Sequence, residues 1–225
     1  MRRIFFATTT FVLLFAQICY AATTLNRSDA DSRARQSFSL RSVEGEMYDL
    51  RIVGDGETVL TDWLWALDDT IFAGDYSAYL CDANSDTFTR QDVELFANNF
   101  GGEHPQRINV TRDNRDGCHK VTGVNGLPDL LVSKIQITGG GFFDMKIFVV
   151  KNGRLQTLQF PGDGSFKTSR DTGFEPTTYR DDGTISVPWW TNAPGSEGRY
   201  VTFYRLDADN LTLSPLRTEK TWSPQ

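Results

Sequence analysis

Short runs of alternating apolar and polar residues, separated by turn-forming clusters, are the feature that most restricts the fold of this chain. Residues 47–53 end at Gly54-Asp55-Gly56, and residues 76–81 end at a cluster of Asp, Asn and Ser over 82–86. A period of two places alternate side chains on opposite faces of a strand, whereas a helix requires a period of 3.6. Strands that alternate with long helices, as in a parallel doubly wound sheet, are not evident. The sequence therefore predicts an all-β, antiparallel protein.

Further strand candidates follow along the chain, separated by turns rich in Asn, Asp and Gly. They cover residues 59–65, 88–96, 107–111, 130–137, 145–150, 155–160, 184–189, 200–206 and 211–216. Residues 90–99 also suit a short helix, because Val93, Phe96 and Ala97 would share one of its faces.

Three stretches of the chain resemble one another: residues 57–95, 129–160 and 183–217. Each contains a strand, a loop, a second strand, a short turn and a third strand. Such a unit cannot bury its inner face alone and must stack on its neighbours, as the blades of a propeller do. We therefore expect a β-propeller-like fold of four or five short blades, with a β-sandwich as the alternative.

The first 21 residues have the pattern of a secretory signal peptide. Arg2-Arg3 precedes an apolar run over residues 4–18, and Cys19-Tyr20-Ala21-Ala22 follows it. We expect cleavage after Ala21 or Ala22 and a secreted or periplasmic protein. The alternatives are an uncleaved anchor and a lipidated Cys19. No other apolar stretch approaches the length of a membrane span, so no permanent span is expected.

The rest of the chain divides into a flexible segment over residues 22–37, which has few apolar residues, and a single all-β domain over residues 38–225. Without the leader, two cysteines remain, Cys81 and Cys118. In an exported chain they point to one disulfide, with two buried free thiols as the alternative. Asn26, Asn109 and Asn210 are glycosylation acceptors if the source is eukaryotic.

Composition excludes several functions. A net charge of −6 argues against nucleic acid as a partner, and two histidines leave no room for a multi-histidine metal site. No nucleophile elbow, zinc-protease motif or phosphate-binding loop is present. The acid pairs Asp68-Asp69 and Asp181-Asp182 would point to opposite faces of a strand, which does not suit a glycosidase. We therefore do not expect an enzyme, although a hydrolase built from distant acids stays open.

Residues 121–132, Val-Thr-Gly-Val-Asn-Gly-Leu-Pro-Asp-Leu-Leu-Val, resemble the FG-GAP/VCBS type of β-propeller repeat. In that family a loop rich in Asp, Asn and Gly leads into a strand of the form Pro-Asp-Leu-x-Val. The glycine-and-aromatic run over residues 138–143 resembles a loop of related small exported bacterial propellers. Some members of that group inhibit peptidoglycan hydrolases, so the resemblance implies such an enzyme as one candidate partner.

The family loop also binds Ca²⁺ through acidic residues at alternate positions, since calcium prefers oxygen ligands. Here Asn125 and Asp129 retain suitable side chains, and further acidic and amide residues lie upstream over 113–116. The resemblance thus makes Asn125 and Asp129 candidate Ca²⁺ ligands, against the alternative of a hydrogen-bonded turn. No other cofactor is expected.

Aromatic and glycine-rich loops lie between the first and second strands of the three units. In a stacked antiparallel fold these loops would emerge on one rim, where exposed aromatic residues favour recognition. The candidate partner-binding residues are Ile71, Phe72, Gly140, Gly141, Phe142, Phe143, Trp189 and Trp190. The alternative is that their rings only cap the core.

The sequence therefore predicts an exported binding module of the cell envelope that recognises or inhibits another envelope or secreted protein. A carbohydrate- or peptidoglycan-binding protein is the alternative, because Trp63, Trp65, Trp189 and Trp190 offer stacking surfaces.

Overall fold

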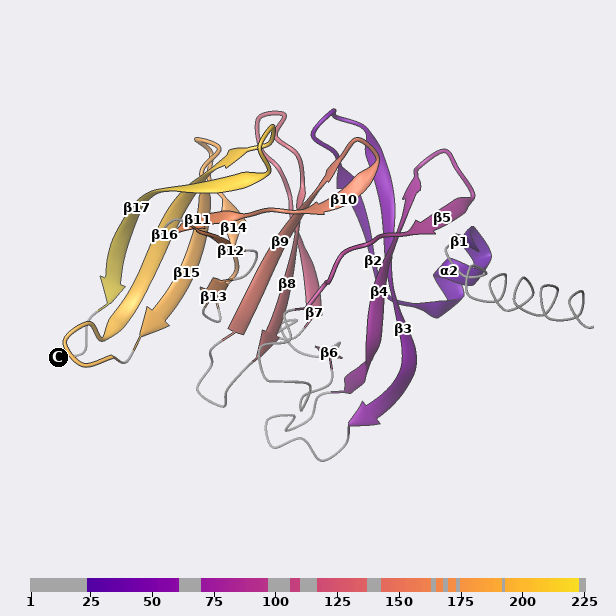
Figure 1. Cartoon of the computed structure of the whole chain (residues 1–225), viewed down its shortest axis with the longest axis horizontal. Coiled ribbons are helices and arrows are strands. Elements are labelled where there is room, and N and C mark those ends of the chain that lie inside the picture. The colour runs from indigo at the N-terminus through magenta and orange to yellow at the C-terminus, as the bar shows by residue number, and fades with distance from the viewer. Residues whose placement is uncertain are drawn as a thin grey trace, which may run out of the picture.

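The computed structural model describes residues 24–60, 70–96, 106–109, 117–136, 143–162, 165–167, 170–172, 175–191 and 193–222. These residues form antiparallel sheets and one short helix (Figure 1), so the predicted all-β class is confirmed. The predicted leader over residues 1–21 lies outside the described residues. In the part that is described, no helix has the length and apolar character needed to cross a membrane.

Three sheets make up most of the structure. The first has the strand order β1-β5-β4-β3-β2, with β6 paired to β4. It contains β1 (Thr24–Asn26), β2 (Ala34–Arg41), β3 (Met47–Leu60), β4 (Ile71–Asp82), β5 (Thr87–Arg90) and β6 (Arg107–Asn109). The helix α2 (Arg27–Arg33) lies between β1 and β2.

The second sheet has the order β10-β9-β8-β7, with β13 paired to β9, and the third has the order β14-β15-β16-β17. The second contains β7 (Gly117–Val121), β8 (Leu130–Gln136), β9 (Phe143–Lys151), β10 (Arg154–Thr157) and β13 (Arg170–Thr172). The third contains β14 (Thr178–Tyr179), β15 (Ile185–Thr191), β16 (Gly198–Asp207) and β17 (Thr212–Trp222). A small hairpin joins β11 (Phe160–Gly162) to β12 (Ser165–Lys167).

The repeat inferred from sequence corresponds to these sheets. Its second and third units supply β8-β9-β10 and β15-β16-β17, whereas its first supplies β4, β5 and only residues 57–60 of β3; each sheet also has one earlier strand, β2, β7 or β14. The described residues thus form three four-stranded meanders, and none of these sheets closes into a barrel or ring. Four or five blades of a propeller were expected; the described residues form several antiparallel sheets, none of them closed, and the propeller-like arrangement stays a prediction. The alternative helix over 90–99 is not formed within its described part, residues 90–96.

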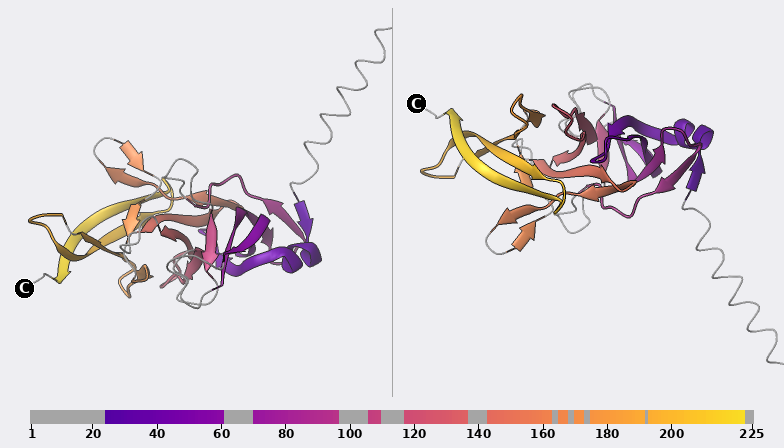
Figure 2. Two further views of the ribbon diagram at one scale, coloured as in Figure 1. Left: turned by 90° about the horizontal axis from the view of Figure 1, so that it is seen from below. Right: turned by 90° about the horizontal axis from the view of Figure 1, so that it is seen from above.

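The three sheets pack face to face, and the second lies between the other two (Figures 1 and 2). On β9, Phe148 and Val150 pack toward the first sheet, whereas Ile147 and Val149 pack toward the third. All four side chains are fully buried. Because both faces of this sheet are covered here, residues 147–150 of β9 are consecutively apolar instead of alternating.

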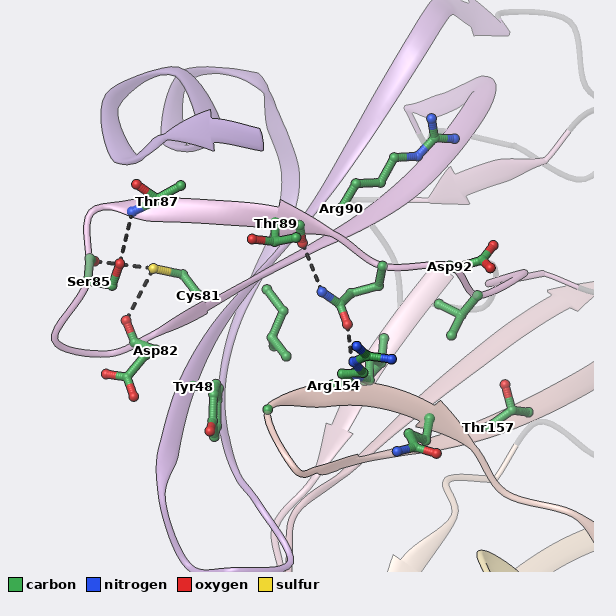
Figure 3. Close-up of a pocket in the computed structure, with 16 residues that line it drawn as sticks. Tyr48, Cys81, Asp82, Ser85, Thr87, Thr89, Arg90, Asp92, Arg154 and Thr157 are labelled. Atoms are coloured by element: carbon green, nitrogen blue, oxygen red, sulfur yellow. Dashed lines mark hydrogen bonds between the residues drawn. The ribbon is translucent and has the colours of Figure 1, made fainter. Parts of the chain in front are cut away.

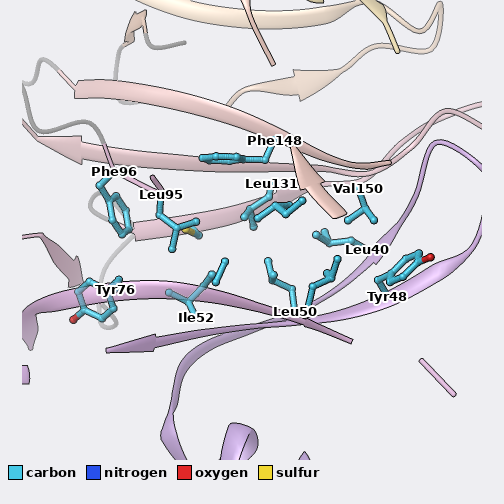
Figure 4. Close-up of a cluster of buried hydrophobic side chains, with 14 of the residues drawn as sticks. Leu40, Tyr48, Leu50, Ile52, Tyr76, Leu95, Phe96, Leu131, Phe148 and Val150 are labelled. Carbon is cyan, nitrogen blue, oxygen red and sulfur yellow. The ribbon is translucent and has the colours of Figure 1, made fainter. Parts of the chain in front are cut away.

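The core between the first and second sheets is built from aliphatic and aromatic side chains of both (Figure 4). Leu40, Leu50 and Ile52 of the first sheet face Leu131 and Phe148 of the second. Each of these five side chains is fully buried.

The segment over residues 22–37, expected to be flexible, is instead ordered from residue 24 as β1, α2 and the start of β2. Asn26 caps α2 by accepting a hydrogen bond from Asp29 N at 2.8 Å. Ala30 is fully buried against Val53 and Phe88 on the outer face of the first sheet. The segment therefore covers the end of the stack opposite the third sheet (Figure 2).

Ion pairs explain why so polar a segment is ordered. Arg27 contacts Asp49 at 2.7 Å, Asp31 contacts Arg51 at 2.7 Å, and Arg33 contacts Asp55 at 2.8 Å. In each pair the second partner lies on β3, about 20 residues away in sequence. Local composition did not reveal these partners.

The disulfide expected between Cys81 and Cys118 is not formed, and both residues are buried free thiols. Cys81 packs on the outer face of the first sheet beside Ala30 and Phe88, whereas Cys118 packs in the core between the first and second sheets. The first sheet thus separates the two sulfur atoms. The cysteines no longer support the argument for export.

Both thiols should therefore be protected in the folded protein and free in the unfolded protein. We expect Cys81 and Cys118 of the leader-free chain to react with Ellman's reagent in concentrated guanidinium chloride without any reductant. In native buffer neither should react rapidly, because the residues are 2% and 0% exposed. Absence of reaction after unfolding would show that a disulfide exists.

The double burial of the second sheet also predicts which side chains matter most for stability. Phe148→Ala should lower the free energy of unfolding by about 3–5 kcal/mol, because it leaves a cavity between two sheets. Val59→Ala is the matched control, since Val59 on β3 is 53% exposed and should change it by less than about 0.5 kcal/mol. Urea unfolding monitored by circular dichroism measures both. Equal effects would contradict the layered core.

Candidate functional site

The strands that lead into the predicted binding loops, β3, β8 and β15, all end on the same side of the molecule (Figure 1). Gly140, Gly141 and Phe142 lie outside the described residues. Phe143 is the first residue of β9, where its backbone is in register with Gln136 and Thr172. The other candidate residues form two pairs: Ile71 and Phe72, which belong to a structural cluster, and Trp189 and Trp190, which are partly accessible.

Ile71 and Phe72, at the start of β4, do not form an exposed tip. Ile71 is 3% exposed, and Phe72 is half-buried beneath the guanidinium of Arg35, whose central carbon lies 3.5 Å from the ring centroid. Arg35 is fixed by two hydrogen bonds to Glu57, of 3.0 and 2.5 Å. Hydrogen bonding to Arg35 lowers the pKa of Glu57 despite partial burial. This pair therefore belongs to a structural cluster.

Trp189 and Trp190, at the end of β15, are partly accessible. The ring of Trp189 stacks on that of Tyr200, with centroids 4.6 Å apart and planes 15° apart. Its indole N–H donates to Thr202 Oγ1 at 3.0 Å, which fixes the orientation of the ring. Trp190 lies opposite Arg199 of β16, and Arg199 in turn lies opposite Trp222 of β17.

We call Trp189, Trp190, Tyr200 and Trp222 the aromatic end of the third sheet. Trp222 is 55% exposed, and Lys220 Nζ lies 5.5 Å from the centroid of the Tyr200 ring. Sequence reasoning missed Tyr200 and Trp222, because their proximity to β15 depends on the register of three strands. A hairpin between the strands at 184–189 and 200–206 could have suggested Tyr200.

The two candidate calcium ligands bind different partners. Asp129, 3% exposed, accepts hydrogen bonds from the backbone N–H groups of Arg41 and Gly123 and forms an ion pair with Lys120, each at 2.8 Å. Burial alone would raise the pKa of Asp129, but these three donors outweigh it and lower that pKa. Asn125 Nδ2 instead donates to the carbonyl of Asp181 at 2.7 Å.

Asp129 thus links the second sheet to β2 of the first, and Asn125 links it to the third. A calcium ion at Asp129 would have to displace the three donors. Within the described part of the chain, no group of three or more His, Cys, Asp or Glu residues is arranged to hold a metal ion.

Two ionisable side chains of the second sheet are withdrawn from solvent. Burial lowers the pKa of Lys134 to about 8, although the nearby Glu175 opposes the shift, and Lys134 Nζ donates to the Glu175 carbonyl at 3.1 Å. Burial and the charge of Lys134 lower the pKa of His119 to about 4. His119 Nε2 is buried without a hydrogen-bond partner among the described residues.

A groove of about 730 Å³ opens between β5 of the first sheet and β10, an edge strand of the second (Figure 3). One wall is β5 with the following segment, and the other is β10 with its Asn152-Gly153 turn. The lining residues include Tyr48, Asp82, Thr87, Thr89, Arg90, Gln91, Asp92, Arg154, Gln156 and Thr157. The groove is therefore polar, with hydroxyl, amide and charged groups of both signs. Sequence reasoning did not identify it.

Comparison of the chain with protein-family models, with curated proteins and with solved structures finds no match. Geometry alone therefore defines its class, a stack of three antiparallel sheets with an aromatic end and a polar groove. The resemblance to FG-GAP/VCBS repeats stays a prediction.

The buried histidine predicts how stability depends on pH. The pKa of His119 is about 4 in the folded protein and 6.5 in its unperturbed state, so the unfolded chain takes up a proton first as pH falls. Stability should therefore decrease between pH 6.5 and pH 4, by up to about 3 kcal/mol from this residue. His119→Gln should reduce that decrease, measured by urea unfolding across the range. An unchanged pH profile would contradict the burial of this imidazole.

Proposed function

We propose that this protein is a binding module of the cell envelope that recognises or inhibits another protein through the aromatic end of the third sheet. The carrying observation is that Trp222, more than half exposed, and the partly accessible Trp190 lie on one face of the sheet, both in register with Arg199, while the partly accessible Trp189–Tyr200 pair stacks on the other face. Aromatic side chains with a polar edge and fixed orientation are the commonest hot spots of protein interfaces. Arg199 and Lys220 add positive charges beside the rings.

Two features of the sequence support the compartment and the partner. The leader-like pattern over residues 1–21 supports export to the periplasm or the exterior. The resemblance to small exported propellers supports a peptidoglycan hydrolase as a partner. On this view the three meanders are the blades of an open, propeller-like array.

Carbohydrate or peptidoglycan binding is the second candidate. The observation that favours it is the nearly parallel arrangement of Trp189 and Tyr200, at 15°, which offers a flat, amphipathic surface. Trp63 and Trp65, the other expected stacking residues, lie outside the described residues. The proposal assigns no catalytic role to any residue.

Substitution at the aromatic end tests the proposal. Trp190→Ala and Trp222→Ala should each weaken capture of the protein partner from an envelope extract by about 30-fold, as loss of a hot-spot residue does. Val59→Ala, which removes a similarly exposed apolar side chain from β3, should leave capture unchanged. The readout is quantitative mass spectrometry of the retained proteins.

A parallel sedimentation experiment with purified insoluble peptidoglycan separates the two candidates. Co-sedimentation that depends on Trp222, without capture of any protein, would favour carbohydrate binding. If both tryptophan variants behave like the wild type in both experiments, the aromatic end is not a recognition surface.

A further inference from the structure

We infer that the groove between β5 and β10 binds an extended peptide segment of a partner protein, which adds a strand to the free edge of β10. This site is separate from the aromatic end of the third sheet, so either one can fail without the other. The volume of about 730 Å³ lies within the range of about 300–1,000 Å³ typical of ligand pockets. The backbone of β10, the charges of the walls and the state of other strand edges carry the inference.

The hydrogen-bond pattern of β10 shows which of its backbone groups face outward. β10 pairs with β9 through a two-residue Asn-Gly turn, and just beyond β10 Leu158 N donates to Ile147 O of β9 at 2.8 Å. Ladder bonds alternate along an antiparallel strand, so Leu155 and Thr157 direct their N–H and C=O groups away from β9. Leu155 N accordingly donates to Gln91 Oε1, at 2.9 Å, across the groove.

Thr157 occupies the open position on this edge. On one side of it, Leu155 N is bonded to the Gln91 side chain. On the other side, Gln159 exchanges two hydrogen bonds of 2.8 Å with Leu211 and Leu213. Between them, the outward N–H and C=O of Thr157 have no partner among the described residues. An added strand would pair with Thr157 as the Leu211–Leu213 segment pairs with Gln159.

Three other stretches of strand edge that the structure describes are closed or protected. On β7, Cys118 N and O both bond to the Gln36 side-chain amide, at 2.9 and 3.0 Å. On β4, Tyr76 N donates to Gln106 Oε1 at 3.0 Å. The edge strand β17 contains Pro215 and several charged residues, which discourage pairing with another strand. Among the described residues, β10 has at Thr157 neither a glutamine side chain bonded to its backbone nor a proline or charged residue.

The walls of the groove indicate the side chains that the peptide carries. Arg154 on β10 and Arg90 on the facing wall are exposed, and neither forms an ion pair with a described residue. Asp92 lies beside Arg90 on that wall. Side chains of an extended peptide alternate between two faces, so an acidic residue would meet Arg154 while its backbone pairs with Thr157. The ligand is therefore an extended peptide with at least one acidic side chain.

The test uses the leader-free protein and a phage-displayed library of random dodecapeptides. We expect selection on the wild type to enrich peptides that contain an acidic residue. Thr157→Pro removes the outward N–H without breaking a β9–β10 ladder bond, and should weaken binding of these peptides at least about tenfold. Thr157→Val keeps that N–H and should bind them as the wild type does.

Arg154→Glu is the second test, because it alters an exposed side chain and leaves the backbone of β10 intact. It should also weaken the selected acidic peptides at least about tenfold. Trp222→Ala should bind them as the wild type does. The inference is overturned if no peptide is enriched, or if the selected peptides bind Thr157→Pro and Arg154→Glu as tightly as the wild type. Loss of binding only in Trp222→Ala would also overturn it, while supporting the aromatic end as the recognition surface.

Discussion

The burial of the second sheet on both faces is the constraint on which the rest of the structure depends. Along β9, Ile147 and Val149 bind it to the third sheet, whereas Phe148 and Val150 bind it to the first. Each outer sheet then has one face in a core and one face at the end of the stack. Different kinds of residue cover the outer faces of the first and third sheets at the two ends of the stack.

At one end, the N-terminal segment covers the first sheet with a small apolar cluster around Ala30 and with ion pairs to β3. At the other end, arginine side chains of the third sheet lie over the aromatic ring of Phe203. Phe203 is 3% exposed, and the guanidiniums of Arg217 and Arg180 lie 4.0 and 5.3 Å from its ring centroid. Arginine stems can cover apolar surface while their charges reach water. Among the described residues, charged side chains thus cover apolar groups at both ends of the stack.

Sequence patterning predicted the strands of this stack much better than it predicted their partners. The runs at 130–137, 145–150 and 200–206 correspond closely to β8, β9 and β16, because buried strands carry dense apolar residues. β7 was missed, since His119 and Lys120 interrupt its apolar pattern. The order of residues 24–37 and the separation of Cys81 from Cys118 depend on contacts between distant segments. Local composition contains no record of such contacts.

The candidate sites show the same contrast between features visible in the local sequence and contacts between distant segments. The tryptophans at 189–190 were found because aromatic pairs are visible in a sequence, but their link to Tyr200 and Trp222 required the register of the third sheet. In the sequence, the Ile71-Phe72 pair looked equivalent to the tryptophan pair, but in the structure Ile71 is buried and Phe72 is covered. Arg35 covers Phe72 from a neighbouring part of the first sheet, a contact that no spacing rule predicts. Aromatic residues in corresponding loops are thus separated into structural and accessible ones only by long-range charge contacts.

The lengths of the strands determine where this stack can bind other molecules. Its layers are filled by side chains, so accessible backbone is left mainly at strand edges, and most of the edges discussed above are closed by glutamine amides or by charge. β10 has four residues whereas its partner β9 has nine. The short strand leaves the groove beside it, and Gln91 bridges only one end of that groove. A chain that protects several other edges by such specific means, and leaves the backbone of Thr157 without a partner among the described residues beside a polar groove, has the geometry of a site for an incoming strand.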